Sequence, residues 1–205
     1  MTSVKVAAKA VGGWYVDKCI GRMVLPVILP GYNALEIVIP FGRKSNLEAC
    51  FILGGFGVRA EGPECTLTEP VKTLYFGDIT RLGLPFYGGN ITYHMECEIN
   101  SGAAEIAATC YRGHLLRVSV DGRDAGIIAF SPYRLKIEGL PPGPHKIDLT
   151  YYGGRINTFG QLHRIDRHMP WCDPDSWRTR GAAWSYEYSF WPQGVLKSPE
   201  IFTRT

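Results

Sequence analysis

Apolar and polar side chains alternate along several short runs of the chain. The clearest run is Leu116–Val120, in which every second residue is apolar. Alternation with a period of two places one set of side chains on each face of a β-strand. The dipeptide Asp121-Gly122 follows directly, and it suits the positive φ angles of a type I′ turn. The pattern therefore predicts a β-hairpin that turns at these two residues.

Further alternating runs lie on both sides of this hairpin, with turn residues between them. The longest is Ile91–Ile99. The shorter ones are Gly126–Phe130, Tyr133–Ile137 and Ile147–Tyr151. Residues 103–108 would fit one turn of helix, but Thr109-Cys110-Tyr111 directly after them favours another strand. Short strands with turn signals about every 8–12 residues are typical of a β-sandwich or a barrel.

Glycine and proline strengthen this all-β prediction. The 24 glycines and 14 prolines are spread along the 205 residues rather than gathered in one linker. Because both residue types interrupt helices, they leave little room for a helix longer than about three turns. Aromatic residues make up 12% of the chain, and such side chains fill the broad faces of packed sheets.

The charge of the chain does not point to a nucleic acid or a membrane as partner. Lys and Arg number 22 and Asp and Glu 19, for a net charge of +3, and so weak a bias predicts neither partner. No apolar run approaches the roughly 18 residues of a membrane span. The first residues also lack the apolar stretch of a signal peptide. We therefore expect a cytoplasmic location.

One short pattern occurs twice. Gly31–Ile39 and Gly143–Tyr151 share a glycine turn followed by an apolar-acidic-apolar run, at a constant offset of 112 positions. A glycine-arginine pair follows each run, Gly42-Arg43 in the first and Gly154-Arg155 in the second. Because this offset is about the length of one sandwich domain, it suggests two tandem sandwiches, of which the first retains only its last strands. The alternative is that glycine turns before alternating strands resemble one another in any β protein.

A longer segment resembles a known family. Tyr75–Tyr93 is similar to the opening of the galactose-binding-like jelly-roll domains of large bacterial glycoside hydrolases, among them family 2-like and α-L-rhamnosidase-like proteins. That opening reads gd-x-x-x-x-G-x-pfY-x-G-x-v-x-Y. Other segments resemble further parts of the same proteins. Val118–Gly122 and Leu140–Leu149 are similar to a hairpin and a later strand. Trp184–Leu196 resembles the final strand and the exit turn, with the strand expected at Trp184–Tyr188. Gly13–Asp17 and Asn46–Val58 resemble the end of the preceding sandwich. The chain departs from the pattern at His145, where asparagine is usual, and at Gly55, where aspartate is usual.

The resemblance implies an architecture and a role. Residues 1–66 would be the terminal strands of a preceding β-sandwich, and residues 67–205 a galactose-binding-like jelly-roll β-sandwich. The role would be that of a non-catalytic, carbohydrate-binding accessory region whose catalytic module lies elsewhere in a longer parent chain. Two alternatives stay open, namely a purely structural spacer beside a catalytic barrel and a self-contained glycoside hydrolase.

The carboxylates show no catalytic pattern. Glycoside hydrolysis needs two carboxyl groups across one glycosidic bond. Glu96 and Glu98 alternate with apolar residues, which places both on one face of a strand, most simply the solvated face. We therefore expect no catalytic residue in this chain.

Residues 163–175 form the densest group of possible metal ligands. His163, His168 and Cys172 are zinc-ligand types, and Asp173 and Asp175 offer oxygens to calcium. The segment lacks a second closely spaced ligand pair for zinc and the acidic repeat of an EF-hand loop. We expect no cofactor, with a structural calcium ion as the alternative, and the simplest interpretation is a long loop that caps one end of the sandwich.

The same loop is the best candidate for a sugar site. Sugars present apolar C–H faces to aromatic rings and hydroxyl groups to planar polar side chains. The candidate residues in the loop are Trp171, Trp177, Asp173 and Arg178. Tyr87, Asn90, Arg155, Asn157 and His163 would join them if the strand ends meet at one rim. Alternatively, the last three of these form a buried corner network that holds the loop in place.

Overall fold

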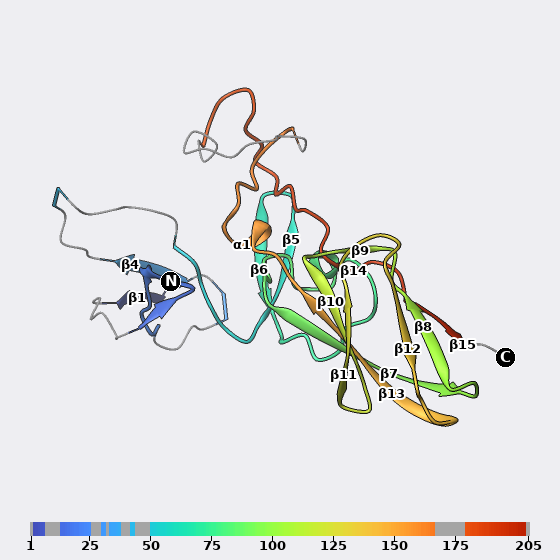
Figure 1. The fold of residues 1–205 in the computed structure, drawn as a ribbon. Helices are drawn as coiled ribbons and strands as arrows, with labels where there is room; N and C mark the ends of the chain where they lie inside the picture. The colour runs from blue at the N-terminus through green and yellow to red at the C-terminus, as the bar shows by residue number, and fades with distance from the viewer. Residues whose placement is uncertain are drawn as a thin grey trace. The chain divides into compact units, whose positions relative to one another are not determined.

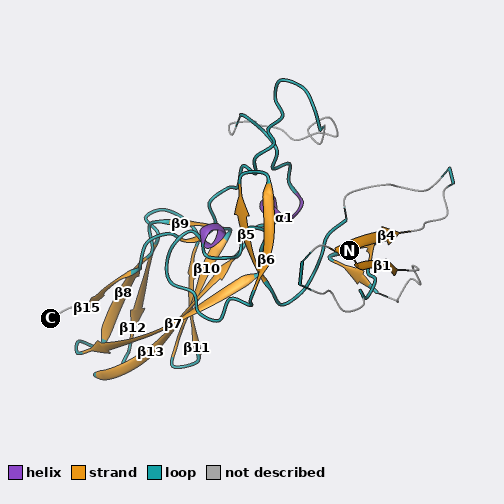
Figure 2. Ribbon diagram, turned by 180° about the vertical axis from the view of Figure 1, so that it is seen from behind, coloured by secondary structure: helices purple, strands orange, loops and turns teal. Residues whose placement is uncertain are grey.

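The computed structural model describes residues 2–6, 13–25, 30–31, 33–37, 42–43, 50–166 and 179–203. The chain divides into two units, residues 1–53 and residues 54–205. Strands make up most of the regular structure (Figure 2). Among the described residues, helix is confined to the single turns η1 (Ile79–Arg81) and α1 (Ile156–Phe159). The predicted all-β fold class is confirmed.

The first unit contains two small strand pairs. β1 (Thr2–Val6) pairs in parallel with β4 (Asn33–Ile37), and β2 (Trp14–Tyr15) pairs antiparallel with β3 (Asp17–Gly21). β4 belongs to the first copy of the repeated pattern. Its counterpart in the second copy, β13, is antiparallel to both of its neighbours. The two copies therefore differ in their strand pairing, and a second sandwich in this part of the chain stays a prediction.

The second unit contains a four-stranded and a three-stranded antiparallel sheet (Figure 1). The larger sheet has the order β11 (Arg123–Ile128), β10 (Leu115–Val120), β13 (Gly143–Tyr152) and β7 (Asn90–Ile99). The smaller has the order β12 (Arg134–Glu138), β8 (Ala103–Ala107) and β15 (Glu200–Thr203). Two further antiparallel pairs are β9 (Tyr111–Arg112) with β14 (Gly194–Val195) and β5 (Gly57–Glu61) with β6 (Glu64–Thr68).

The predicted alternation explains how the two sheets pack. Every second residue of β10 from Leu116 and of β13 from His145 is buried, and all of these side chains except that of His145 share one apolar cluster with Ile106 of β8 and Ile137 of β12. Since β8 and β12 belong to the smaller sheet, the cluster joins one face of each sheet. The second unit is therefore a β-sandwich.

The predicted hairpin is confirmed. It consists of β10 and β11, and its turn residues Asp121 and Gly122 have φ angles of 51° and 76°. Two positive φ angles define the type I′ turn that the Asp-Gly pair predicts. The Asp121 carboxylate also ties the turn to β13, because it accepts a hydrogen bond from the backbone N–H of Lys146 at 2.9 Å.

The closing strand lies later in the chain than the resemblance implies. Trp184 makes only an isolated bridge with Arg164, and residues 185–188 form no strand. The backbone N–H of Ser185 donates to His163 and that of Tyr188 to Gly62, so the hydrogen bonds of this segment go to two different partners. The expectation of a strand here is wrong, and β14 and β15 are the last strands of the chain that the structure describes.

The hairpin β5–β6 belongs to the second unit. The backbone N–H of Val58 donates to the Gly83 carbonyl oxygen at 2.8 Å, and that of Tyr188 donates to the Gly62 carbonyl oxygen at 3.2 Å. The division between the units accordingly falls between Leu53 and Gly54, earlier than the boundary that we expected between residues 66 and 67. The assignment of the two parts to separate domain families stays a prediction.

Candidate functional site

Three glycine-containing turns meet at one end of the sandwich. A Cβ atom on Gly88 would lie 3.0 Å from Cγ of Arg155, and one on Gly153 would collide with the Gly89 carbonyl oxygen. The third turn carries His114, whose Nε2 lies 3.5 Å from the Cβ position of Gly154. A side chain at Gly153 would push the backbones of two of these turns apart. We call this surface, formed by residues 87–90, 113–114 and 153–155, the glycine rim.

The glycine rim displays four exposed polar or aromatic side chains, those of Tyr87, Asn90, His114 and Arg155. Tyr87 is 41% exposed, and its hydroxyl donates to the Asn90 carbonyl oxygen at 3.0 Å. This bond fixes the ring beside Gly89. The rim thus offers an aromatic ring, an amide, an imidazole and a guanidinium group to solvent, which is the mixture of groups that suits a sugar.

The sequence predicts three of these four residues. Tyr87, Asn90 and Arg155 come together at the rim, while their role in binding stays a prediction. His114 was missed, although a signal for it exists. Its turn directly precedes β10, and Leu115 pairs with Tyr152 at the end of β13. In an antiparallel pair, the residues just before one strand lie beside those just after the other, which places His114 near residues 153–155.

Asn157 has a structural position. It is completely buried, its side-chain nitrogen donates to the Trp191 carbonyl oxygen at 2.7 Å, and its side-chain oxygen accepts from the Trp191 N–H at 3.0 Å. The amide therefore pairs with Trp191 as a strand backbone would, and it has no surface to offer a sugar. Asn157 is therefore buried, as in the corner network that the sequence left open, but its partner is Trp191, and Arg155 of that network is exposed.

His163 lies half-buried in a group of aromatic rings. Its Nδ1 donates to the Ser185 carbonyl oxygen at 3.1 Å, and its ring centroid lies 5.6 Å from that of Trp184 and 4.3 Å from that of Tyr188. Tyr186 packs edge-on against Trp184 and is 75% exposed. His163 thus supports an aromatic surface whose solvent-facing member is Tyr186, a residue that the sequence analysis did not single out.

The other candidate residues of the capping loop lie outside the described residues. They are His168, Trp171, Cys172, Asp173, Asp175, Trp177 and Arg178. Within the ranges that the structure describes, no group of three His, Cys, Asp or Glu side chains is placed to hold a metal ion. Calcium or zinc binding by the loop therefore stays untested.

The carboxylates of β7 lie on its solvated face, as predicted. Glu96 and Glu98 are exposed and stand opposite Lys146 and Pro144 of β13. Asp78 is less exposed, and its Oδ1 accepts hydrogen bonds from the Thr80 backbone N–H and the Thr80 hydroxyl. The same oxygen accepts from the backbone N–H of Gln193 at 3.2 Å, so this carboxylate joins two distant segments of the chain.

Comparison with known proteins gives structural likenesses only. No protein-family model matches the chain, and no curated protein matches it. A rhamnosidase from Novosphingobium sp. PP1Y has a TM-score of 0.41 at 16% identity over 80% of this chain. A GH2 β-galacturonidase from Eisenbergiella tayi has a TM-score of 0.31 at 20% identity over 46% of the chain. A β-D-glucuronidase of Dictyoglomus thermophilum has a TM-score of 0.30 at 15% identity over 57% of the chain.

The chain spans only a small part of each of these enzymes, namely 16%, 17% and 22% of their lengths. Likenesses at this level define neither a family nor an activity. The class that the described residues define is an all-β protein whose second unit is an antiparallel β-sandwich with an exposed, glycine-lined end. In the described part of the chain, no helix has the length and apolar character to cross a membrane.

Proposed function

We propose that this chain is a non-catalytic accessory region of a larger glycoside hydrolase-like protein, and that it binds carbohydrate. The observation that carries this proposal is the glycine rim, where Tyr87, Asn90 and Arg155 stand exposed on closely packed turns. An aromatic ring next to planar polar groups matches the apolar face and the hydroxyl groups of a sugar ring. The resemblance of Tyr75–Tyr93 to accessory jelly-roll domains points the same way.

The proposed site has two parts. The rim supplies Tyr87, Asn90, Arg155 and, by its position, His114. The capping loop supplies Trp171, Trp177, Asp173 and Arg178. His163 and Asn157 support the loop and the corner without touching the ligand. The partner within the protein would be the catalytic module of the same parent chain.

Calorimetric titration of the chain with a panel of neutral and acidic oligosaccharides tests the proposal. Tyr87→Ala and Arg155→Ala should each weaken the affinity about tenfold, the loss expected for one stacking or charged contact. Arg59→Ala is the matched control, because Arg59 is an exposed arginine of β5 in an ion pair with Glu61. Equal affinity in the wild type and both rim variants would place the site elsewhere.

Two variants test the capping loop. Trp171→Ala and Trp177→Ala should weaken saccharide binding and leave the melting temperature nearly unchanged. If both variants instead unfold the protein, these tryptophans belong to a core and the loop part of the site is wrong.

The two rival functions give different results in the same assays. A structural spacer binds no saccharide of the panel. A self-contained hydrolase releases nitrophenol from nitrophenyl glycosides, and replacement of one carboxylate of the capping loop, such as Asp173, abolishes that turnover. Either result would contradict a non-catalytic binding region.

A further inference from the structure

A groove follows the outer edge of β7, next to the glycine rim. Its walls are residues 71–76 on one side and residues 91–94 of β7 on the other, and its volume is about 750 Å³. β7 is the last strand of its sheet, so that within the described residues this edge has no strand partner. The groove begins one residue beyond Asn90 of the rim. Its size lies in the range of typical small-ligand sites, about 300–1,000 Å³.

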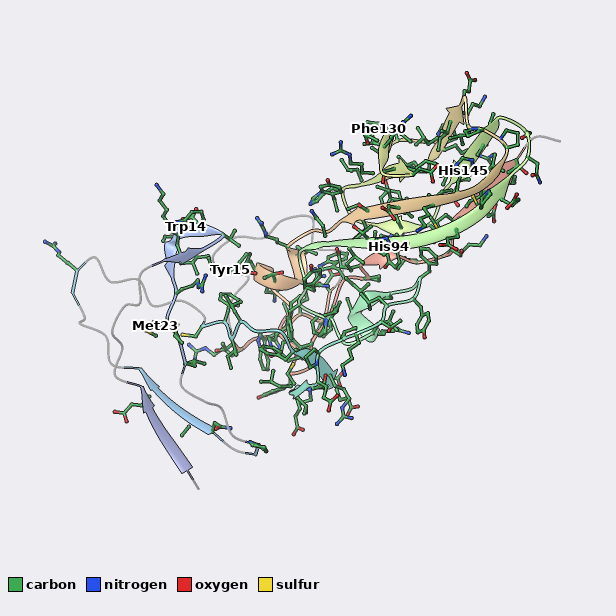
Figure 3. The ribbon with its side chains drawn as sticks, turned by 90° about the horizontal axis from the view of Figure 1, so that it is seen from below. Trp14, Tyr15, Met23, His94, Phe130 and His145 are labelled. Carbon is green, nitrogen blue, oxygen red and sulfur yellow. The ribbon has the colours of Figure 1, made fainter. Side chains whose placement is uncertain are left out.

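The outer face of β7 and β13 borders this groove with cross-strand pairs of polar side chains. Thr92 stands opposite Thr150, and their hydroxyl oxygens are 2.9 Å apart. His94 stands opposite Asp148, and Nδ1 of the histidine is 2.7 Å from Oδ1 of the carboxylate. Figure 3 shows His94 beside the middle of the long strand pair. Because residues alternate along a strand, these pairs continue the face on which Asn90 stands.

The pairs are fixed in position and still have hydrogen-bonding capacity. The bond to Asp148 holds the His94 ring, so that its Nε2 points away from the carboxylate. Among the described residues, no hydrogen bond reaches this Nε2 or Oδ2 of Asp148. A nitrogen and an oxygen on two neighbouring side chains suit two adjacent hydroxyl groups of a sugar ring. Side chains that are already held lose little conformational entropy when they bind a ligand.

An aromatic ring lies on the opposite wall. Tyr75 lines the groove and is 73% exposed. The neighbouring Phe76 stacks on Tyr93 with ring centroids 4.6 Å apart, which anchors this wall to the core. Tyr75 can therefore offer its ring to the apolar face of a sugar, while His94 and Asp148 bind hydroxyl groups.

We propose that the site takes an oligosaccharide chain rather than a single sugar. One unit binds at the glycine rim, and the following units lie in the groove along β7 between Tyr75 and the His94–Asp148 pair. His94 lies four residue steps along the strand from Asn90, a distance of about 13 Å, which is too long for one sugar ring. This inference rests on the proposed carbohydrate binding. It adds the direction in which the saccharide chain runs, from the rim along β7, and a ligand length of more than one sugar unit.

Titration of the intact chain with mono-, di- and trisaccharides of one series tests the inference. For the wild type we expect the affinity to rise at least about tenfold from the monosaccharide to the trisaccharide. Tyr75→Phe should keep this gain, because the ring remains. Tyr75→Ala and His94→Ala should abolish the gain and leave monosaccharide binding unchanged. Phe130→Ala, at an 83% exposed position outside the groove, is the control and should behave as the wild type.

The outcomes separate the inference from the proposed function. If saccharides bind but their length has no effect, or if the two groove variants keep the gain, the inference is wrong and the rim site stands. If no saccharide of any length binds the wild type, the proposed function itself fails and the inference fails with it. Loss of monosaccharide binding in the groove variants would also overturn the order of units along the chain.

Discussion

Asn157 pairs with Trp191 through its side chain as if it were a short piece of strand, with one hydrogen bond donated and one accepted. Asn157→Ala leaves the N–H and the carbonyl oxygen of Trp191 without these partners. Each unpaired buried group costs about 1–3 kcal/mol, so the free energy of unfolding should fall by about 3 kcal/mol. Urea denaturation measures it. Asn90→Ala, at an exposed asparagine, should change it by less than about 0.5 kcal/mol, and an equal loss in both variants would contradict the special position of Asn157.

His145 predicts a stability that falls at alkaline pH. The ring is 4% exposed, its Nε2 lies 2.8 Å from the Pro141 carbonyl oxygen, and its Nδ1 lies 2.6 Å from Oδ2 of Asp121. Both contacts favour the doubly protonated ring, so the Pro141 carbonyl and the Asp121 carboxylate raise the pKa of His145 above 6.5. A raised pKa stabilises the fold fully below pH 6.5, and this stabilisation disappears as the pH rises through the higher value in the folded protein.

The variants His145→Gln and Asp121→Asn check this dependence. The difference in unfolding free energy between the wild type and His145→Gln should be larger at pH 5.5 than at pH 8.5. Asp121→Asn keeps a side chain that tolerates the positive φ of the turn, and in this background the pH dependence should be weaker. A difference that is the same at both pH values would contradict this dependence.

Asp121 predicts a loss of stability at acid pH. The Lys146 backbone N–H, and after it the His145 side chain, lower the pKa of Asp121 below 3.8. A lowered pKa stabilises the fold above pH 3.8, and this contribution is lost as the pH falls through the lower value. The wild type should therefore lose more stability than Asp121→Asn when guanidinium denaturation is repeated at successively lower pH. Parallel acid profiles of the two proteins would contradict this.

Gly194 is a position that only glycine fits. Its φ is 106°, and a Cβ atom would lie 2.8 Å from the Gly77 carbonyl oxygen and 2.9 Å from Cγ2 of Ile79. Gly194→Ala should lower the free energy of unfolding by about 2 kcal/mol or more, visible as a lower melting temperature. Gly55→Ala is the matched control, because a Cβ atom there meets nothing within 4 Å. Unchanged melting of Gly194→Ala would mean that the segments around Gly77 and Gly194 separate at little cost.

Tyr151 should titrate late and make the sandwich lose stability at alkaline pH. Its hydroxyl lies 2.7 Å from the Arg112 carbonyl oxygen and 2.8 Å from Oε1 of Gln193, and burial raises its pKa to about 12. In the unfolded chain this tyrosine ionises near pH 10, whereas in the folded protein it stays neutral up to about pH 12. The free energy of unfolding therefore falls as the pH rises from 10 to 12. Tyr151→Phe should cost about 1–2 kcal/mol at pH 7 and remove this alkaline loss. Urea denaturation at pH 7 measures the first effect, and denaturation repeated at successive pH values between 10 and 12 measures the second. An identical alkaline profile in the variant would contradict the assignment.

The sequence predicts those elements of the fold that depend on local pattern. The alternation in Leu116–Val120 and the Asp121-Gly122 turn suffice for β10 and β11, and Ile91–Ile99 for β7, because exposure of one face and burial of the other follow from period two. The apolar run at residues 103–108 is also a strand, as its flanking residues favour. These predictions require no knowledge of distant partners.

The remaining features depend on partners far along the chain. The segment Trp184–Tyr188 alternates like a strand, yet its backbone bonds go to His163 and to Gly62, which do not form one regular ladder. The burial of Asn157 depends on Trp191, and no local pattern contains that pairing. The candidate site is only partly predictable from local pattern. Antiparallel pairing of neighbouring strands brings the rim turns together, but the groove along β7 also depends on where residues 71–76 lie, which no local pattern predicts.

The central position of β8 has a consequence for synthesis. One neighbour, β12, follows within a few tens of residues, but the other, β15, pairs Thr203 with Ala104. While the polypeptide emerges from the ribosome, one edge of β8 therefore stays unpaired until β15 has been synthesised. Unpaired strand edges attract other strands, and contacts between distant residues form slowly. Premature release of this chain should therefore favour aggregation through β8, and newly made molecules should depend on chaperones more than refolded ones do.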